Sequence, residues 1–115
     1  MSLDLPNIVE IIEVMENYLE KIRPSVHIPE KLDITYLIEN QSVILQEVRP
    51  IFQQYGKKME SGYAKATYIK SGDKWKVYWR RANLKWYKYE PRPEVKNLKE
   101  FVKLVEEDAH HFFKG

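Results

Sequence analysis

The stretch that decides the fold runs from Trp75 to Pro91 and reads Trp-Lys-Val-Tyr-Trp-Arg-Arg-Ala-Asn-Leu-Lys-Trp-Tyr-Lys-Tyr-Glu-Pro. It holds all three tryptophans of the chain and three of its eight tyrosines, interleaved with lysines and arginines. Aromatic and β-branched residues favour strands, and a pair of turn-compatible residues interrupts them. We therefore expect two antiparallel strands joined near Ala82 and Asn83, with large rings filling one face and cations on both.

Two hairpins are expected before this point. In the first, Leu32–Glu39 and Ser42–Arg49 flank Asn40-Gln41, where Asn suits a positive φ. Pairing Glu39 with Ser42 sets the register, because strand side chains alternate between faces. The face expected under the helices then carries Leu32, Ile34, Tyr36, Ile38, Val43, Leu45, Glu47 and Arg49.

The second expected hairpin joins Ala64–Lys70 to Trp75–Arg81 through a type II′ turn at Gly72-Asp73. This register places Ala66 opposite Trp79 on the core face and leaves room for the indole ring. The other face then carries Lys65, Thr67, Ile69, Lys76, Tyr78 and Arg80. A fifth strand is expected at Leu84–Tyr89, closed by Pro91 and Pro93, whereas Gln53–Gly62 has no apolar period and predicts an exposed loop.

A helix is predicted at each end of the chain. Near the N-terminus, apolar residues recur at steps of three and four and end before Pro24: Leu5, Ile8, Ile12, Met15, Leu19 and Ile22. Near the C-terminus, Asn97 and Glu100 resemble a capping box that opens a second apolar stripe: Leu98, Phe101, Val102, Val105, Ala109 and Phe112. The predicted fold is a single α+β domain over residues 1–115, with an N-terminal helix, about five antiparallel strands in sequential hairpins and a C-terminal helix, both helices on one face.

Composition and charge exclude some classes of function and favour others. The chain has no cysteine, which excludes a disulfide framework and a thiolate nucleophile. The absence of a leader and of a long apolar run predicts a cytoplasmic protein that does not enter a membrane. The net charge of +2 hides an acidic first part, −6 over residues 1–48, and a basic middle, +9 over residues 49–96. Such a field attracts an anionic partner unless the acidic helix neutralises it internally.

Several motifs together carry a family resemblance: Glu47-Val48-Arg49-Pro50, Ala64-Lys65-Ala66, the tryptophan-rich block W-x-x-x-W-x-R-A-N-L-K-W-x-x-Y-x-P from Trp75 to Pro91, and an ending in which Phe112 and Phe113 follow Asp108. In these the chain resembles an uncharacterised bacterial domain-of-unknown-function family, number three thousand and twenty-four. Tyr87 and His111 stand where that family often has His and Cys. The resemblance implies a small single-domain protein and supplies no mechanism.

The first candidate site is a cluster of charges. Glu47 and Arg49 are expected on the helix-covered face, and Arg81 on the corresponding face of the second hairpin. With Lys85 and Asp108 these residues form either a structural ion network or a pocket for a small anion, because charges that point into a core must pair. A hydrolase that uses these residues is a further alternative.

The second candidate is the exposed sheet face, with Lys65, Lys76 and Arg80 around Tyr78. Cations contact phosphates and rings stack on bases, a combination typical of single-stranded nucleic-acid platforms. The same residues are also common on a solvated antiparallel face. No metal site and no cofactor is predicted, since the adjacent His110 and His111 diverge by about 100° on a helix.

The sequence favours a binding or interaction module without catalytic activity. Its basic aromatic face is expected to contact an anionic partner, and nucleic acid is the first candidate. The alternatives are a small-anion binder or hydrolase at the charge cluster, and self-association as a homodimer through an exposed sheet edge.

Overall fold

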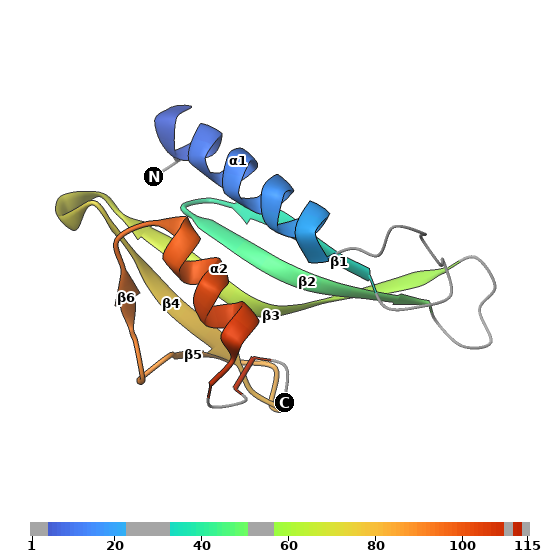
Figure 1. Ribbon diagram of the computed structural model, residues 1–115. Helices are drawn as coiled ribbons and strands as arrows, with labels where there is room; N and C mark the ends of the chain where they lie inside the picture. The colour runs from blue at the N-terminus through green and yellow to red at the C-terminus, as the bar shows by residue number, and fades with distance from the viewer. Residues whose placement is uncertain (1–4, 23–32, 51–56, 110–111, 114–115) are drawn as a thin grey trace.

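The computed structural model describes residues 5–22, 33–50, 57–109 and 112–113 (Figure 1). In chain order its elements are α1 (Leu5–Ile22), β1 (Asp33–Glu39), β2 (Ser42–Pro50), β3 (Lys58–Ile69), a 3₁₀ turn (Lys70–Gly72), β4 (Lys74–Arg80), β5 (Trp86–Lys88), β6 (Glu94–Val95) and α2 (Leu98–Glu107). The strands pair antiparallel in the order β1-β2-β3-β4-β5, and β6 pairs with β4. The predicted α+β fold is confirmed.

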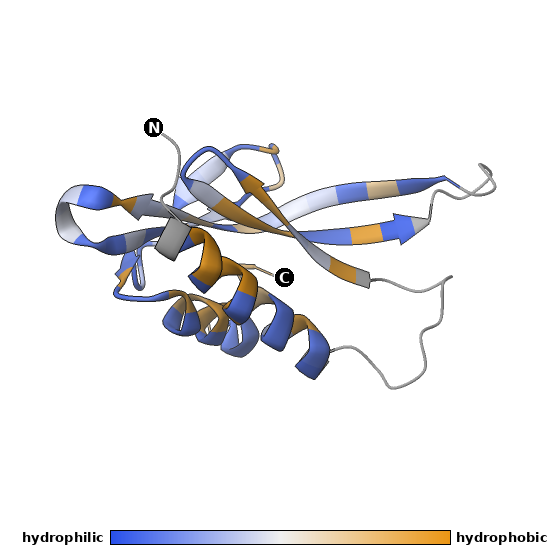
Figure 2. Ribbon diagram, turned by 90° about the horizontal axis from the view of Figure 1, so that it is seen from above, coloured by the Kyte–Doolittle hydropathy of each residue, from blue (hydrophilic) through white to orange (hydrophobic). Residues whose placement is uncertain are grey.

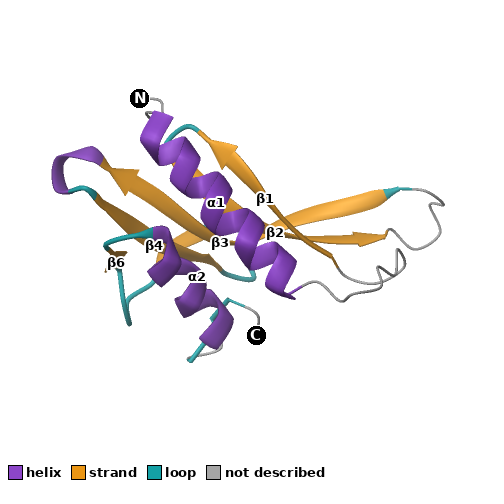
Figure 3. Ribbon diagram, turned by 45° about the horizontal axis from the view of Figure 1, so that its top comes forward, coloured by secondary structure: helices purple, strands orange, loops and turns teal. Residues whose placement is uncertain are grey.

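Both helices lie on the same side of the sheet (Figure 2). α1 crosses β1 and β2, whereas α2 contacts β3 and β4 and packs beside α1 (Figure 3). The residues between helices and sheet are apolar, and Trp75, Tyr89 and Phe101 are the largest fully buried side chains. Because apolar burial drives folding, this single layer between helices and sheet is the core.

The first hairpin has the predicted register. Glu39 lies opposite Ser42, Tyr36 opposite Leu45, and Asn40 takes a positive φ of 54° in the turn. Val43 and Leu45 are fully buried on the helix side, so the face expected under the helices is the correct one.

The predicted register of the second hairpin is wrong by two residues. The connection is not a two-residue turn at Gly72-Asp73 but four residues, with a 3₁₀ turn followed by Asp73 at φ 46°. Ala66 therefore lies opposite Val77, and Trp79 lies opposite Ala64 instead of Ala66. The shift is even, so every side chain keeps its predicted face. Alanine still faces the indole ring of Trp79.

β3 is longer than expected, since Lys58–Gly62 was predicted to be loop and instead pairs with the end of β2. Residues 51–56 of the predicted loop lie outside the described part of the chain. The pairing shifts between Leu45 and Gln46, and this β-bulge leaves Tyr63 without a partner in β2. Tyr63 is buried and contributes to the core.

The tryptophan-rich block contains the expected turn, but its second strand is shorter than Leu84–Tyr89. Leu84 takes φ 66° in the turn and is 66% exposed. The chain then returns to β4 as β6, with Val95 opposite Trp75. This strand was not predicted, because Pro91 and Pro93 indicated that the sheet ended there.

The helix predictions need two corrections. In α1 the buried stripe runs through Ile11, Val14, Met15, Tyr18 and Leu19, and the Ile12 that was expected inside is 46% exposed. The prediction counted aliphatic residues and left out Tyr18, but a tyrosine can bury its ring and belong to an apolar stripe. α2 starts at the predicted cap, where the Asn97 side chain accepts a hydrogen bond from the Glu100 amide.

α2 also ends earlier than predicted. Asp108 adopts the left-handed conformation at φ 41°, so the helix stops at Glu107 instead of continuing to Phe112. The Asp108 carboxylate accepts a hydrogen bond of 3.0 Å from the Phe113 amide. The expected helical pair His110 and His111 lies outside the described residues.

Candidate nucleic-acid interface

The sheet side that faces away from α1 and α2 carries polar and aromatic residues in register; we call it the open face. One row runs across four strands, in which Ile44 lies opposite Lys65, Lys65 opposite Tyr78, and Tyr78 opposite Lys88. In the next row of β4 and β5, Arg80 lies opposite Trp86. The predicted nucleic-acid residues Lys65, Lys76, Tyr78 and Arg80 therefore share this face.

Lys65 occupies the centre of the aromatic part of the open face. Its amino nitrogen lies 5.1 Å from the centroid of the Tyr78 ring and 4.8 Å from that of the Trp86 ring. Burial lowers the pKa of Lys65 from its ordinary value, and the nearby carboxylate of Glu39 opposes that shift. The ammonium is held mainly by ring faces, which attract cations through their quadrupole.

The Trp86 ring reaches across β4 to β3, where Gly62 provides the space for it. A Cβ atom at position 62 would lie 3.2 Å from Trp86 Cζ2 and 2.8 Å from Ile44 Cγ2. Arg80, opposite Trp86 in β4, donates a hydrogen bond of 3.3 Å from Nη1 to the Gly62 carbonyl oxygen. Its Nε is buried and has no partner among the described residues. The position of this ring therefore depends on three strands.

The two sides of the domain differ in charge. By register, six cations lie on the open face against four carboxylates: Lys58, Lys65, Lys74, Lys76, Arg80 and Lys88 against Asp33, Glu39, Glu60 and Glu94. The two helices together carry seven glutamates and three lysines. The acidic and basic parts of the sequence are thus separated onto opposite layers, and an anion approaching the open face meets a net positive field.

The predicted charge cluster does not assemble within the described residues. Glu47 and Arg49 form an ion pair with each other at 3.2 Å on β2. Arg81 instead lies over two rings, 4.7 Å from the Tyr87 centroid and 5.7 Å from that of Trp79. Lys85 is exposed in the β4–β5 turn, where its amide donates a hydrogen bond to Asn83 Oδ1.

Asp108, the last member of that predicted cluster, is buried at the end of α2 and accepts the Phe113 amide. Its charge is close enough to Tyr89 to add to the rise that burial causes in the pKa of that phenol. Asp33 lies opposite Val48, and Glu47 lies opposite Ile34, so Asp33 and Glu47 are on opposite faces of the sheet. Among the described residues no group of three His, Cys, Asp or Glu is arranged to hold a metal ion.

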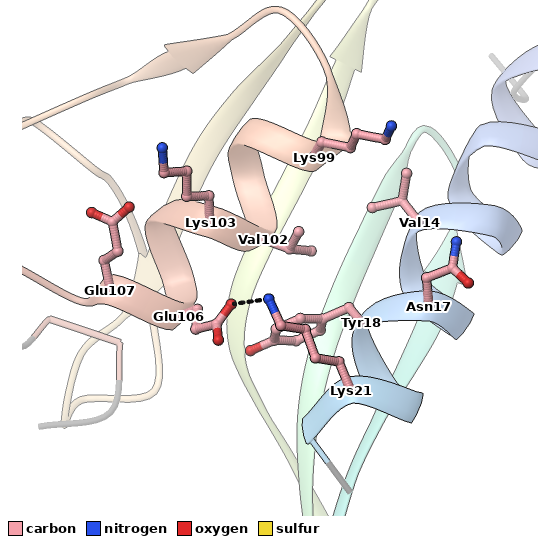
Figure 4. A pocket seen from close by; sticks show the side chains of 9 residues that line it. All are labelled: Val14, Asn17, Tyr18, Lys21, Lys99, Val102, Lys103, Glu106 and Glu107. Carbon is pink, nitrogen blue, oxygen red and sulfur yellow. Dashed lines mark ion pairs between the residues drawn. The ribbon is translucent and has the colours of Figure 1, made fainter.

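A groove of about 470 Å³ lies between the two helices, on the opposite side from the open face (Figure 4). Val14, Tyr18 and Val102 form its apolar part, and Lys21 and Glu106 face each other across it at 4.0 Å. Both partners of this ion pair are well exposed, so it contributes little to stability. The groove lining carries three lysines and two glutamates, a smaller excess of cations than the open face has: Lys21, Lys99 and Lys103 against Glu106 and Glu107.

Sequence reasoning missed two members of the open face, Trp86 and Gly62. The facing of β5 was ambiguous, because apolar residues occur on both sides of Leu84–Tyr89. The pairing of Trp86 with Arg80 follows once the turn is fixed by the hydrogen bond between the Arg81 amide and the Lys85 carbonyl, 3.1 Å long. Counting outward from a three-residue turn at Ala82-Asn83-Leu84, with Arg81 opposite Lys85, places Trp86 opposite Arg80.

The model of the family described as Domain of unknown function (DUF3024) matches residues 4–115. The chain belongs to this family, as its tryptophan-rich block predicted. No curated protein and no solved structure matches it. Among the described helices, none is both long and apolar enough to cross a membrane.

Proposed function

We propose that this domain is a binding module without catalytic activity. Its open face binds an anionic polymer, and nucleic acid is the leading candidate for that polymer. The observation that carries the proposal is the Lys65 ammonium, which lies over the Tyr78 and Trp86 rings on the sheet side away from both helices. Cations supply phosphate contacts and rings supply stacking surfaces, so one face offers both elements of nucleic-acid binding.

The distribution of charge supports the same partner. A polyanion gains from the cations of the open face and is repelled by the glutamates of the helix layer. The domain therefore has one side suited to nucleic acid and one side that disfavours it. A face whose lysines and arginines served only for hydration would not require this separation of charge between the two sides of the domain.

A salt titration with matched variants tests the proposal. Binding of mixed oligonucleotides is followed by fluorescence anisotropy from low ionic strength upward, and affinity should fall linearly on logarithmic axes as salt is added. Neutralising Lys76 and Lys88 to Gln on the open face should lower that slope by about 1.4 for a single strand, since each contact contributes about 0.7. The control neutralises Lys99 and Lys103 to Gln on α2, the same change in net charge on the other side, and should leave the slope unchanged.

Two results count against the proposal. The first is an absence of binding at low ionic strength, and the second is an equal loss of binding in the two double variants. The second result would mean that net charge alone, and not the open face, attracts the oligonucleotide.

Self-association is a second candidate, favoured by the exposure of Leu37 and Ile38 on β1, which are 42% and 38% exposed. β1 is the outermost strand of the sheet order, and edge strands pair readily with a second copy. Sedimentation velocity over a range of concentrations should then show a dimer that Ile38→Lys abolishes. A sedimentation coefficient that stays monomeric throughout excludes this candidate.

A further inference from the structure

We infer that the open face selects single strands, and that bases bind it by taking the place of the Lys65 ammonium on Tyr78 and Trp86, which frees Lys65 to contact a phosphate. This inference rests on the proposed function and names both the substrate class and the binding step. It follows from the position of the Lys65 ammonium over the two rings and from the residues that support the rings.

The group that lies over the Tyr78 and Trp86 rings, the Lys65 ammonium, is able to move. Lys65 reaches both rings with the end of a four-carbon side chain, at 5.1 and 4.8 Å, and forms no ion pair within the described residues. A base stacked on an aromatic ring gains more than a cation does over a ring at an exposed site. A base therefore outcompetes the ammonium for the same ring faces.

The displaced ammonium gains a better partner. Burial on the rings disfavours the charged form of Lys65, which is why its pKa is lowered. A nucleic-acid backbone brings phosphates to the same place, and lysine is a flexible point charge that can follow them. The exchange thus replaces two cation–ring contacts with base–ring contacts and a cation–phosphate contact.

The support under the rings favours stacking over groove contacts. Gly62 leaves the space in which Trp86 lies on the sheet, and Arg80 is tied to the Gly62 carbonyl at 3.3 Å. In a duplex each base is already stacked and paired, so only unpaired bases can lie on these rings.

The experiment compares three probes of about twelve nucleotides, a length within the range of single-strand sites: an oligothymidylate, an abasic strand with the same number of phosphates, and a duplex. Anisotropy at low ionic strength should give an affinity for the oligothymidylate at least about fivefold above that for the abasic strand, since one stacked base gives at least this factor. The duplex should compete no better than the abasic strand.

Variants then assign the stacking to the rings. Trp86→Leu should lose about tenfold in affinity for the oligothymidylate and little for the abasic strand, whereas Trp86→Phe, which keeps a ring, should retain most of the difference. Tyr78→Leu provides a second ring variant if Trp86→Leu unfolds, which circular dichroism reports. Lys65→Met should lower the salt slope for the oligothymidylate by about 0.7, the contribution of one phosphate contact.

The outcomes separate the two proposals. Equal affinity for the oligothymidylate and the abasic strand overturns the stacking inference and leaves electrostatic binding to the open face intact. An unchanged salt slope in Lys65→Met overturns the movement of Lys65 to a phosphate. If no probe binds in a salt-dependent manner, the proposed function fails together with this inference.

Discussion

The amino nitrogen of Lys65 lies 4.8 Å from the centroid of the Trp86 ring, although β4 separates their two strands in the sheet. This contact links β3 to β5 above β4. Its energetic contribution can be measured without any ligand.

A double-mutant cycle with Lys65→Met and Trp86→Leu should give a coupling of about 0.5–1 kcal/mol in the free energy of unfolding, the range of exposed cation–ring pairs. Methionine keeps much of the apolar stem of lysine and removes the charge. Urea denaturation of the four proteins supplies the measurement, with the pair Lys99→Met and Trp86→Leu as the uncoupled control. Strict additivity of the Lys65 and Trp86 variants would show that the ammonium does not stabilise the ring.

Gly62→Ala should destabilise the domain by about 1–3 kcal/mol, the usual cost of overpacking. The new Cβ would lie 2.8 Å from Ile44 Cγ2 and 3.2 Å from Trp86 Cζ2, so either the ring or Ile44 has to move. If the ring moves, oligonucleotide affinity should fall together with stability. Urea denaturation measures the first effect and anisotropy the second.

Gly72→Ala is the matched control for that substitution. Its Cβ would meet only the Lys74 side chain, with Cε at 2.9 Å, and this flexible side chain can move aside. Alanine also reduces the freedom of the unfolded chain, so we expect no change or a gain of up to about 1 kcal/mol. A loss as large as that of Gly62→Ala would point to a general intolerance of alanine in these turns and strands, and not to the Trp86 contact.

Asp108→Ala should destabilise the domain by about 1–3 kcal/mol, because the buried Phe113 amide would lose its acceptor at 3.0 Å. Alanine also adopts the left-handed backbone of φ 41° less readily. Asp108→Asn keeps an acceptor oxygen and suits this conformation, so it should recover most of the lost stability. Thermal unfolding of both variants makes the comparison, and equal losses would assign the effect to charge.

Stability should fall as the pH rises above about 10, and Tyr63→Phe should reduce that fall. Burial, with Tyr18 and Glu47 nearby, raises the pKa of Tyr63 well above its ordinary value of 10.0. Above pH 10.0 the unfolded phenol therefore releases its proton while the folded phenol keeps it, and unfolding becomes easier. Below that pH the group has no such effect.

Urea denaturation from pH 8 to pH 11 of the wild type and Tyr63→Phe measures this dependence. At neutral pH the variant should be no less stable, since the Tyr63 hydroxyl is buried without a hydrogen-bond partner among the described residues. Parallel curves for the two proteins at alkaline pH would assign the loss of stability to other groups.

Local patterns sufficed for the presence of the two helices, for the first hairpin and for the family. Alternation along Asp33–Glu39 and Ser42–Pro50 excluded a slip by one residue, which would have exposed the buried Val43 and Leu45, and the two-residue turn at Asn40-Gln41 set the register. The second hairpin lacked this constraint against a slip of two residues, which leaves all faces unchanged. Only the longer connection at Lys70–Asp73 decided between the two registers.

The residues of the candidate site likewise divide into those that local patterns placed correctly and those that they did not. Lys65, Lys76, Tyr78 and Arg80 were assigned to one face by alternation alone, and they share it. Trp86 could not be added, because the facing of a three-residue strand depends on its partner strand and not on its own pattern. The clustering expected of Glu47, Arg49 and Arg81 assumed that a common face means contact, but Arg81 lies on rings while the other two pair with each other.

By itself the sequence determined the α+β class, the side of the sheet on which the residues of the two predicted hairpins lie, and membership of the family, because periodicity and the tryptophan-rich block are local properties. Tertiary structure decided that Gly62 makes room for Trp86, that Lys65 lies between the rings of two other strands, and that acidic helices and basic strands form opposite layers. These relationships join residues distant in the chain, and they depend on strand order, turn length and twist, which no local pattern specifies.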